Sequence, residues 1–161
     1  MILNNNHEEW HMDYDDAKEK IKQILTKNKE KSVQQVVDFL QSNFELYSWV
    51  GIYVVKHNML YLGPWQGDQA TEHSKIPIGQ GICGAAAKTG KTEIVSDVHS
   101  DNRYLSCFIS TRSEIVVPIK KNSKTIGEID IDSDTKDAFT KEDDLFLKEI
   151  ADMLSEHIHN Q

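Results

Sequence analysis

Hydrophobic side chains recur every three or four residues in three stretches of the chain, which is the spacing of an amphipathic helix. These stretches cover residues 13–27, 32–43 and 141–158. Ser32 precedes Gln35 by three residues, and Thr140 precedes Asp143 by three, so each pair has the spacing of a capping box. We therefore expect two helices at the beginning of the chain and one at its end.

Between these helices the hydrophobic period changes to two, which is typical of strands with one buried face. The long segments with this pattern are residues 49–55, 59–63, 113–119 and 124–132. His57 and Asn58 form a turn signal between the first two segments, and the sequence Lys-Lys-Asn-Ser-Lys at 120–124 joins the last two. The pattern therefore predicts two antiparallel hairpins.

Shorter segments complete the predicted elements. Residues 75–78 are at most an edge strand because Pro77 cannot donate a ladder hydrogen bond, and residues 93–95 are a second short strand. Residues 81–88 predict a short helix that ends at Gly90, and residues 103–107 predict a single helical turn. Too few alternating β-α-β units are present for a parallel sheet, so we expect an α+β domain with a mainly antiparallel sheet flanked by helices.

The length and charge of the chain narrow its class. With 161 residues the chain fits one domain, which we place at residues 13–161, after a flexible N-terminal arm at residues 1–12. Its 18 basic and 26 acidic residues give a net charge of −8, which argues against a nucleic-acid or anionic-membrane partner. Residues 1–10 lack the pattern of a signal peptide and no apolar run is long enough to span a membrane, so we expect a cytoplasmic protein.

A glycine-rich motif, Gly-Gln-Gly-Ile-Cys-Gly at residues 79–84, matches the dinucleotide-binding pattern letter by letter. That pattern should follow a buried parallel strand and precede an acidic residue by about 20 positions. Here it follows the segment broken by Pro77, and Asp97 and Asp101 come too soon. We therefore reject nucleotide binding, and we interpret the glycines as residues that permit a tight turn into the short helix.

The two cysteines of the chain, Cys83 and Cys107, both lie outside the long regular elements. Cys83 falls near a helix N-terminus, where the helix dipole would lower its pKa. Cys107 follows Arg103 and precedes Arg112, two cations that could stabilise a thiolate. A reactive thiol with a resolving partner and a pair of structural thiols are both consistent with these positions.

A metal site is not expected from the local sequence. Cys83 and Cys107, together with His73 and His99, are the candidate ligands, but no two of them have the close spacing of a metal-binding motif.

Carboxylates interrupt the last two predicted strands. Strand alternation places Glu128, Asp130 and Asp132 on one face, away from the neighbouring isoleucines. A two-residue turn at Asn122–Ser123 would pair Glu114 with an isoleucine and separate it from the other acids. A solvated sheet face is the simplest explanation of such a pattern. A shared site for a cation or polar ligand instead predicts a longer loop, or a bulge near residue 127, that brings Glu114 to the same face as Asp130 and Asp132.

Several blocks of sequence together resemble a known family. These are Trp-Val-Gly-Ile-Tyr at 49–53, Leu-Gly-Pro-Trp-Gln-Gly at 62–67, Ile-Pro-Ile-Gly-Gln-Gly-Ile-Cys-Gly at 76–84, Asp-Val-His at 97–99, Ser-Glu-Ile-Val-Val-Pro-Ile at 113–119 and Gly-Glu-Ile-Asp-Ile-Asp-Ser at 127–133. They resemble a GAF domain and, more narrowly, the free methionine-(R)-sulfoxide reductases. The resemblance runs from about residue 32 to the last helix.

The resemblance implies a six-stranded antiparallel sheet, a homodimer and a closed pocket for one amino acid. It also implies that Cys107 attacks the sulfoxide sulfur of free methionine sulfoxide and becomes a sulfenic acid. Cys83 would then form a disulfide with it, which thioredoxin reduces, and no cofactor would be bound. The acids Glu114, Asp130 and Asp132 would bind the sulfoxide oxygen and the ammonium group, and the aromatic residues Trp49 and Tyr53 would enclose the methyl end.

Three positions depart from the family pattern. His73 stands where many members have a third cysteine, Phe108 where an aspartate is common, and Arg112 where an asparagine is frequent. The alternative that these departures leave open is a GAF domain that binds a small ligand without catalysis and acts through a partner protein.

Overall fold

Four helices and six strands make up the computed structural model, which describes residues 12–27 and 29–158. In chain order they are α1 (Tyr14–Lys27), α2 (Ser32–Asn43), β1 (Trp49–Lys56), β2 (Met59–Gln66), β3 (Lys75–Pro77), α3 (Gly81–Thr89), β4 (Glu93–Val95), a 3-10 turn (Val98–Ser100), β5 (Ser113–Lys121), β6 (Lys124–Ser133) and α4 (Lys141–Leu154). The expected helices and strands are confirmed, apart from the helical turn predicted at residues 103–107. Residues 1–11, most of the expected N-terminal arm, lie outside the described residues.

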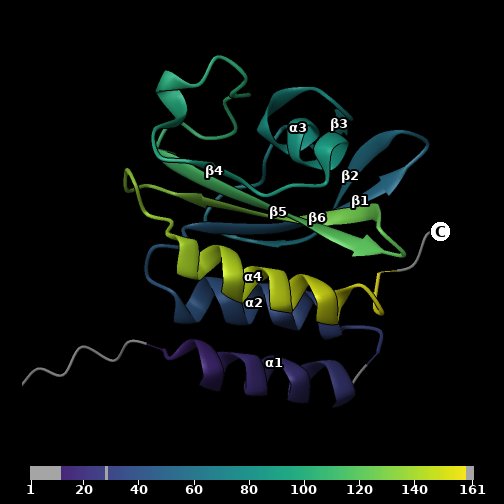
Figure 1. The fold of residues 1–161 in the computed structure, drawn as a ribbon. Coiled ribbons are helices and arrows are strands. Elements are labelled where there is room, and N and C mark those ends of the chain that lie inside the picture. The colour runs from purple at the N-terminus through teal and green to yellow at the C-terminus, as the bar shows by residue number, and fades with distance from the viewer. Residues whose placement is uncertain (1–11, 28, 159–161) are drawn as a thin grey trace, which may run out of the picture.

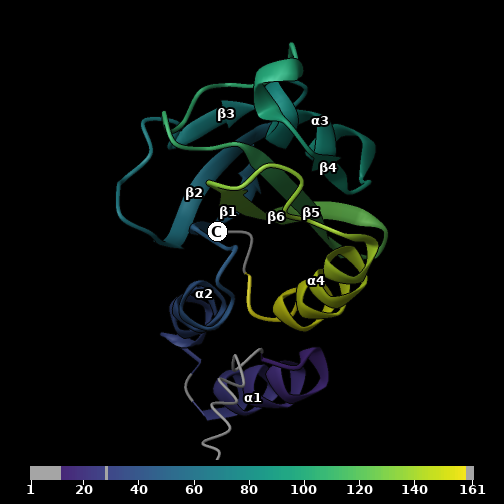
Figure 2. The ribbon, with the colours of Figure 1, turned by 90° about the vertical axis from the view of Figure 1, so that its left-hand side faces the viewer.

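The strands form one sheet in the order β3-β2-β1-β6-β5-β4, and every neighbouring pair is antiparallel. Helices α2 and α4 cover one face of the sheet, and α1 lies beneath them as an outer layer (Figure 1). Helix α3 and the long loops cover the opposite face (Figure 2). The expected α+β class with a six-stranded antiparallel sheet is therefore confirmed.

Strand alternation divides the core into two parts. One part lies between the sheet and the helices α1, α2 and α4, and it takes every second residue of the central strands. From the sheet it includes Val50, Ile52, Ile115, Val117, Ile119, Ile129 and Ile131. The other part lies between the sheet and α3, and it contains both cysteines together with Trp49 and Tyr53. The alternating residues of β5 and β6 that face this second part are largely carboxylates.

A β-bulge sets the register of the β5–β6 hairpin. The turn is the two-residue type, with positive φ at Asn122 and Ser123, and Lys120 pairs with Thr125. The next pair is Ile119 with Gly127, so Ile126 has no partner on β5 and the register shifts by one. This bulge near residue 127 was one of the two arrangements that a shared acidic site required, and the prediction is confirmed.

Three local predictions are wrong. Ser32 is the first residue of α2 rather than its cap, and no side chain caps that helix, because the Ser32 hydroxyl donates to the carbonyl of Lys29. Residues 103–107 form no helical turn; the chain instead makes its 3-10 turn at 98–100, where Asp97 accepts a hydrogen bond from the backbone N–H of His99. Strand β2 continues through Pro64 to Gln66, beyond the predicted end.

The described helices were compared with the requirements of a membrane-spanning helix. None of them combines the length and the apolar sequence that crossing a bilayer would require.

Candidate active site

Four carboxylates meet on the sheet face beneath α3. The bulge pairs Glu114 with Asp132 and Val116 with Asp130, so Glu114 and the acids of β6 project to the same side. Glu128 lies on this side too, opposite Tyr53 of β1. At most 4% of each of these four residues is exposed to solvent. The face is therefore buried, and the solvated sheet face considered from the sequence does not occur.

These carboxylates have few partners inside the protein. Neither oxygen of Glu128 or Asp132 accepts a hydrogen bond, and one oxygen of Asp130 is also without a donor. None of the ion pairs among residues 12–27 and 29–158 involves any of the four acids. Buried carboxylates without partners are costly, so this face is shaped for a ligand rather than for stability.

Burial is the first cause that raises the pKa of each of these acids. It raises the pKa of Asp130 from 3.8 to about 6. The pKa values of Glu114, Glu128 and Asp132 are raised well above their ordinary values, by burial and then by the charge of Asp130. Buried acids that lie close together have different pKa values in this way, because the charge of one opposes ionisation of the others. The site can therefore offer both a protonated carboxyl and an ionised one.

The resolving candidate Cys83 lies directly against this cluster. It is the third residue of α3, and positive φ at Gly79 and Gly81 turns the chain sharply into that helix. The thiol of Cys83 donates to Oε1 of Glu114 at 3.7 Å. Helix α3 contacts both β5 and β6, which places its buried side directly over the acids. The glycine motif therefore positions a thiol through the tight turn that the sequence predicted.

The expectation that the helix dipole lowers the pKa of Cys83 is wrong. Burial raises that pKa well above the ordinary thiol value, and the charges of Asp130 and Glu128 raise it further. A dipole effect is modest and is felt only near the helix end, whereas burial beside carboxylates opposes thiolate formation more strongly. Cys83 is therefore held as a thiol in the ligand-free protein.

Cys107 lies in the long loop between the 3-10 turn and β5, and it is only partly buried. Its thiol donates to the carbonyl of Leu105 at 3.3 Å. Burial and then the charge of Asp130 raise its pKa as well, while a hydrogen bond with Thr71 lowers it. Asp130 thus acts on both cysteines, and both thiols are free.

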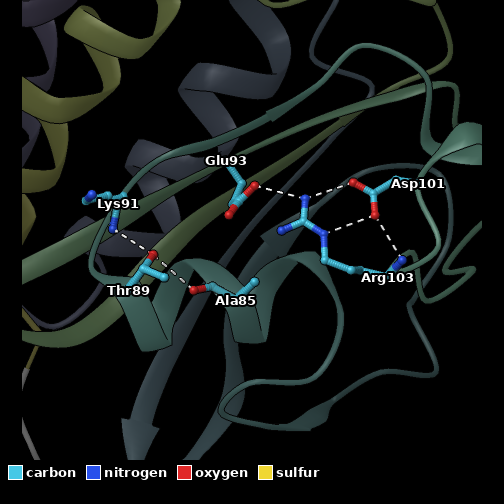
Figure 3. A network of polar contacts seen from close by, with 6 residues as sticks. All are labelled: Ala85, Thr89, Lys91, Glu93, Asp101 and Arg103. Carbon is cyan, nitrogen blue, oxygen red and sulfur yellow. Dashed lines mark hydrogen bonds and ion pairs between the residues drawn. The ribbon is translucent and has the colours of Figure 1, made fainter.

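The arginines expected near Cys107 have other partners. Arg103 donates to Asp101 at 2.8 Å and to Glu93 at 3.0 Å, and Figure 3 shows its guanidinium between these two carboxylates. Arg112 contacts the ring of His99 at 2.7 Å. The prediction that either arginine stabilises a thiolate at Cys107 is therefore not supported, because Arg103 instead fixes the base of the loop on β4.

Trp49 and Tyr53 are buried on the same face and each ties down the loop that follows β2. The indole N–H of Trp49 donates to the carbonyl of Gln69 at 3.2 Å, and the hydroxyl of Tyr53 donates to the carbonyl of His73 at 2.7 Å. A side chain at Gly51 would collide with the indole of Trp49, so glycine is needed there. The two aromatic residues therefore line the site and also close it.

The two loops over the site are joined at His73. Its Nε2 lies 3.2 Å from the carbonyl of Ser106, which must accept, so the ring donates a hydrogen bond to the residue before Cys107. Phe108, on the other side of Cys107, is buried and packs against Trp49 with 5.7 Å between ring centroids. The departures at His73 and Phe108 therefore both hold the segment that carries Cys107.

Two residues of the site were missed as site residues in the sequence. Glu128 was recognised as sharing a face with Asp130 but was not expected to take part, and its full burial could not be read from the strand pattern. Phe108 was noted only as a departure from a family pattern. Its position between Cys107 and a polar loop gave no sign that its side chain would turn inward.

The site could hold one cation. Cys83, Glu114 and Asp130 each offer a ligand atom, and these atoms lie within 4.8 Å of one another. Neither histidine considered in the sequence, His73 or His99, belongs to this group. An ammonium group is one cation that fits such a set of acceptors.

Comparison with known proteins gives the same fold. A family model described as GAF domain matches residues 28–158. The free methionine-R-sulfoxide reductase of Saccharomyces cerevisiae is 42% identical over 112 residues, which cover 67% of this chain and 61% of that protein.

Solved structures extend the similarity over almost the whole chain. The type II free methionine-R-sulfoxide reductase of Thermoplasma acidophilum is 39% identical with a TM-score of 0.77, and the match covers 88% of this chain and 94% of that one. The free methionine-R-sulfoxide reductase of Neisseria meningitidis, solved in complex with its substrate, is 32% identical with a TM-score of 0.83, and the match covers 89% and 87% of the two chains.

Proposed function

Because this chain is a GAF domain protein of the free methionine-R-sulfoxide reductase family, we propose that it reduces free L-methionine-(R)-sulfoxide to methionine. The observation that carries the proposal is the bulge at Ile126, which places Glu114, Asp130 and Asp132 on one buried face beside both cysteines.

Cys107 is the nucleophile in this proposal. Its sulfur attacks the sulfoxide sulfur while a protonated carboxyl, Glu114 or Asp132, donates to the sulfoxide oxygen. The raised pKa values of these acids favour the protonated form that this step needs. The thiol proton of Cys107 replaces the donated one, so that methionine leaves and Cys107 keeps the oxygen as a sulfenic acid.

Selection of the free amino acid over a peptide residue follows from the carboxylate that stays ionised in the site. Burial raises the pKa of Asp130 only to about 6, so this carboxyl is ionised at neutral pH and can pair with the substrate ammonium. A methionine sulfoxide residue within a peptide has no ammonium group at this position. Trp49 and Tyr53 enclose the methyl end of the substrate.

Cys83 resolves the sulfenic acid. Its thiol condenses with Cys107, so that a Cys83–Cys107 disulfide forms and the oxygen leaves as water with the thiol proton of Cys83. A thioredoxin dithiol then reduces the disulfide, which is within reach because Cys107 is only partly buried. Membership of the family supports the further proposals of a homodimer and a cytoplasmic location.

The test is NADPH consumption coupled through thioredoxin reductase and thioredoxin, with free L-methionine-(R)-sulfoxide as substrate. Cys107→Ser should lower the rate by about 10³-fold or more, because it removes the nucleophile. Cys83→Ser should release one methionine per chain and then stop in the thioredoxin assay. The (S)-epimer and the N-acetylated sulfoxide serve as control substrates and should be poor.

Two outcomes would contradict the proposal. Turnover that persists in Cys107→Ser would place the chemistry elsewhere. Absence of turnover in the unmodified protein, with or without a co-purified small molecule, would favour the non-catalytic ligand-binding GAF domain.

A further inference from the structure

Three side chains from separate elements converge beneath α3. Cys83 comes from α3, Glu114 from β5 and Asp130 from β6, and their ligand atoms lie within 4.8 Å of one another. The sulfur of Cys83 is 3.7 Å from Oε1 of Glu114. In a tetrahedral zinc site, with bonds of about 2.3 Å to sulfur and 2.0 Å to oxygen, neighbouring ligand atoms are about 3.5 Å apart. The distance from Cys83 to Glu114 therefore fits shared coordination, and the limit of 4.8 Å leaves Asp130 near enough to move into the same coordination shell.

A second observation points to a cation at the same place. Asp130 keeps one oxygen without a hydrogen-bond donor, and neither oxygen of Asp132 or Glu128 has one. All three side chains are at most 1% exposed, and they project from β6 on the side of Cys83. No lysine, arginine or histidine pairs with them within the described part of the chain. Coordination to a divalent ion would satisfy acceptors that the protein itself leaves unsatisfied.

We propose that a thiophilic divalent cation of the zinc class binds to the reduced protein through Cys83, Glu114 and Asp130. A thiolate ligand selects such an ion over magnesium and calcium, which prefer oxygen ligands alone. Binding transfers the thiol proton of Cys83 and the carboxyl proton of Glu114 to solvent, and metal bonds to sulfur and oxygen take their place. Asp132 and Glu128 project from β6 on the same side but lie outside this group of three ligand atoms.

Such binding has a consequence for the proposed reductase, and this consequence rests on the proposed function. The ion would occupy Glu114 and Asp130, which receive the substrate, and it would hold the sulfur that resolves the sulfenic acid. Metal and free methionine sulfoxide would then exclude each other. Zinc would therefore inhibit the reductase, and a chelator that removes the zinc would restore its activity.

The binding test uses Co²⁺, which reports its ligands by colour, added to the reduced protein without oxygen. We expect a thiolate-to-cobalt charge-transfer absorption that saturates at one ion per chain and is displaced by Zn²⁺ but not by Mg²⁺. Cys83→Ser should abolish the absorption, and Cys107→Ser should retain it. Asp130→Asn keeps both thiols and should weaken binding by about 100-fold, whereas Asp152→Asn on the exposed side of α4 should not.

The outcomes separate the two proposals. Lack of a thiolate band in the folded, reduced protein would overturn the metal site, and so would a band that requires Cys107 instead of Cys83. Because binding is measured without turnover, a protein that binds cobalt but reduces no sulfoxide would refute only the proposed function. If both activities are present, raising the sulfoxide concentration should displace Co²⁺, and failure to do so would refute the shared site.

Discussion

Buried acids occur on both faces of the sheet, but only those beside α1, α2 and α4 have several strong partners. Asp143, near the beginning of α4, completes a capping box with Thr140 and accepts hydrogen bonds from the hydroxyls of Tyr47 at 2.6 Å and Tyr14 at 3.0 Å. Asp144 pairs with the ammonium groups of Lys141 at 2.7 Å and Lys148 at 3.1 Å. These two aspartates are therefore part of what holds α4 in place.

The acids on the other face are equally buried and have almost nothing to bind. Glu128 and Asp132 accept no hydrogen bond. Glu114 accepts one from the thiol of Cys83. The pKa of Asp144 is lowered by its lysines in spite of burial, whereas the pKa of Asp132 is raised well above its usual value by burial and by Asp130. The presence or absence of partners, rather than burial, separates an acid that stabilises the fold from one that awaits a ligand.

The largest expected effect separates activity from stability. Asp130→Asn removes the carboxylate that is proposed to pair with the substrate ammonium, and we expect kcat/KM for free methionine sulfoxide to fall by about 10²–10³-fold. The free energy of unfolding should not fall, because the amide removes a poorly compensated charge. Enzyme assays and urea unfolding of the same preparation measure both quantities.

Leu147→Ala is the matched control on the other face. Leu147 is fully buried in the helix-side core, so its truncation should cost about 2–5 kcal/mol of unfolding free energy. The folded fraction should keep its kcat/KM. If activity and stability decline together in both variants, the division between the two faces is wrong.

A pair of apolar replacements sharpens the comparison. Glu128→Met replaces an unpartnered buried carboxyl with a side chain of similar size, and we expect the unfolding free energy to rise by about 1–3 kcal/mol. Asp143→Leu should lower it by about 1–3 kcal/mol, because the backbone N–H of Thr140 and the hydroxyl of Tyr47 lose their acceptor. Denaturant unfolding at one pH measures both changes. Destabilisation by Glu128→Met would show that this carboxyl has a structural partner.

Much of this contrast could be predicted from the sequence. The capping box at Thr140 and the alternation of acids with isoleucines on β6 are local patterns, and both are observed. The bulge was one of two arrangements, with a longer loop, that would bring Glu114 to the face of Asp130 and Asp132, and the structure has the bulge. Burying a charge among the isoleucines of the helix-side core would cost more than one unpaired residue in the ladder.

The remaining features depend on contacts between distant segments. The pKa of Cys83 is raised by burial and then by acids of β5 and β6 that lie 31 or more residues further along the chain, and these effects outweigh that of the helix that carries it. Arg103 has acidic partners at Asp101 and Glu93, so its closeness to Cys107 in sequence was misleading. The capping box at Ser32 failed because the chain enters α2 one residue earlier, at Lys31. The spacing of residues within one segment cannot predict which distant side chains a residue will contact.

The smallest expected effect concerns how the unfolding free energy depends on pH, which should differ between acids on the two faces of the sheet. Folding raises the pKa of Asp130 from 3.8 to about 6, so the folded protein holds this proton more tightly than the unfolded chain does. Its contribution to stability is therefore present below pH 3.8 and is lost as the pH rises through about 6. The pKa of Asp144 is lowered, so its contribution has the opposite sign and is lost as the pH falls. Urea unfolding across this range should show that Asp130→Asn makes the decline shallower, with the remainder coming from the raised pKa values of the other three acids, whereas Asp144→Asn leaves the decline in place. An unchanged decline in Asp130→Asn would mean that the acids of the site face are not held in their protonated form by burial.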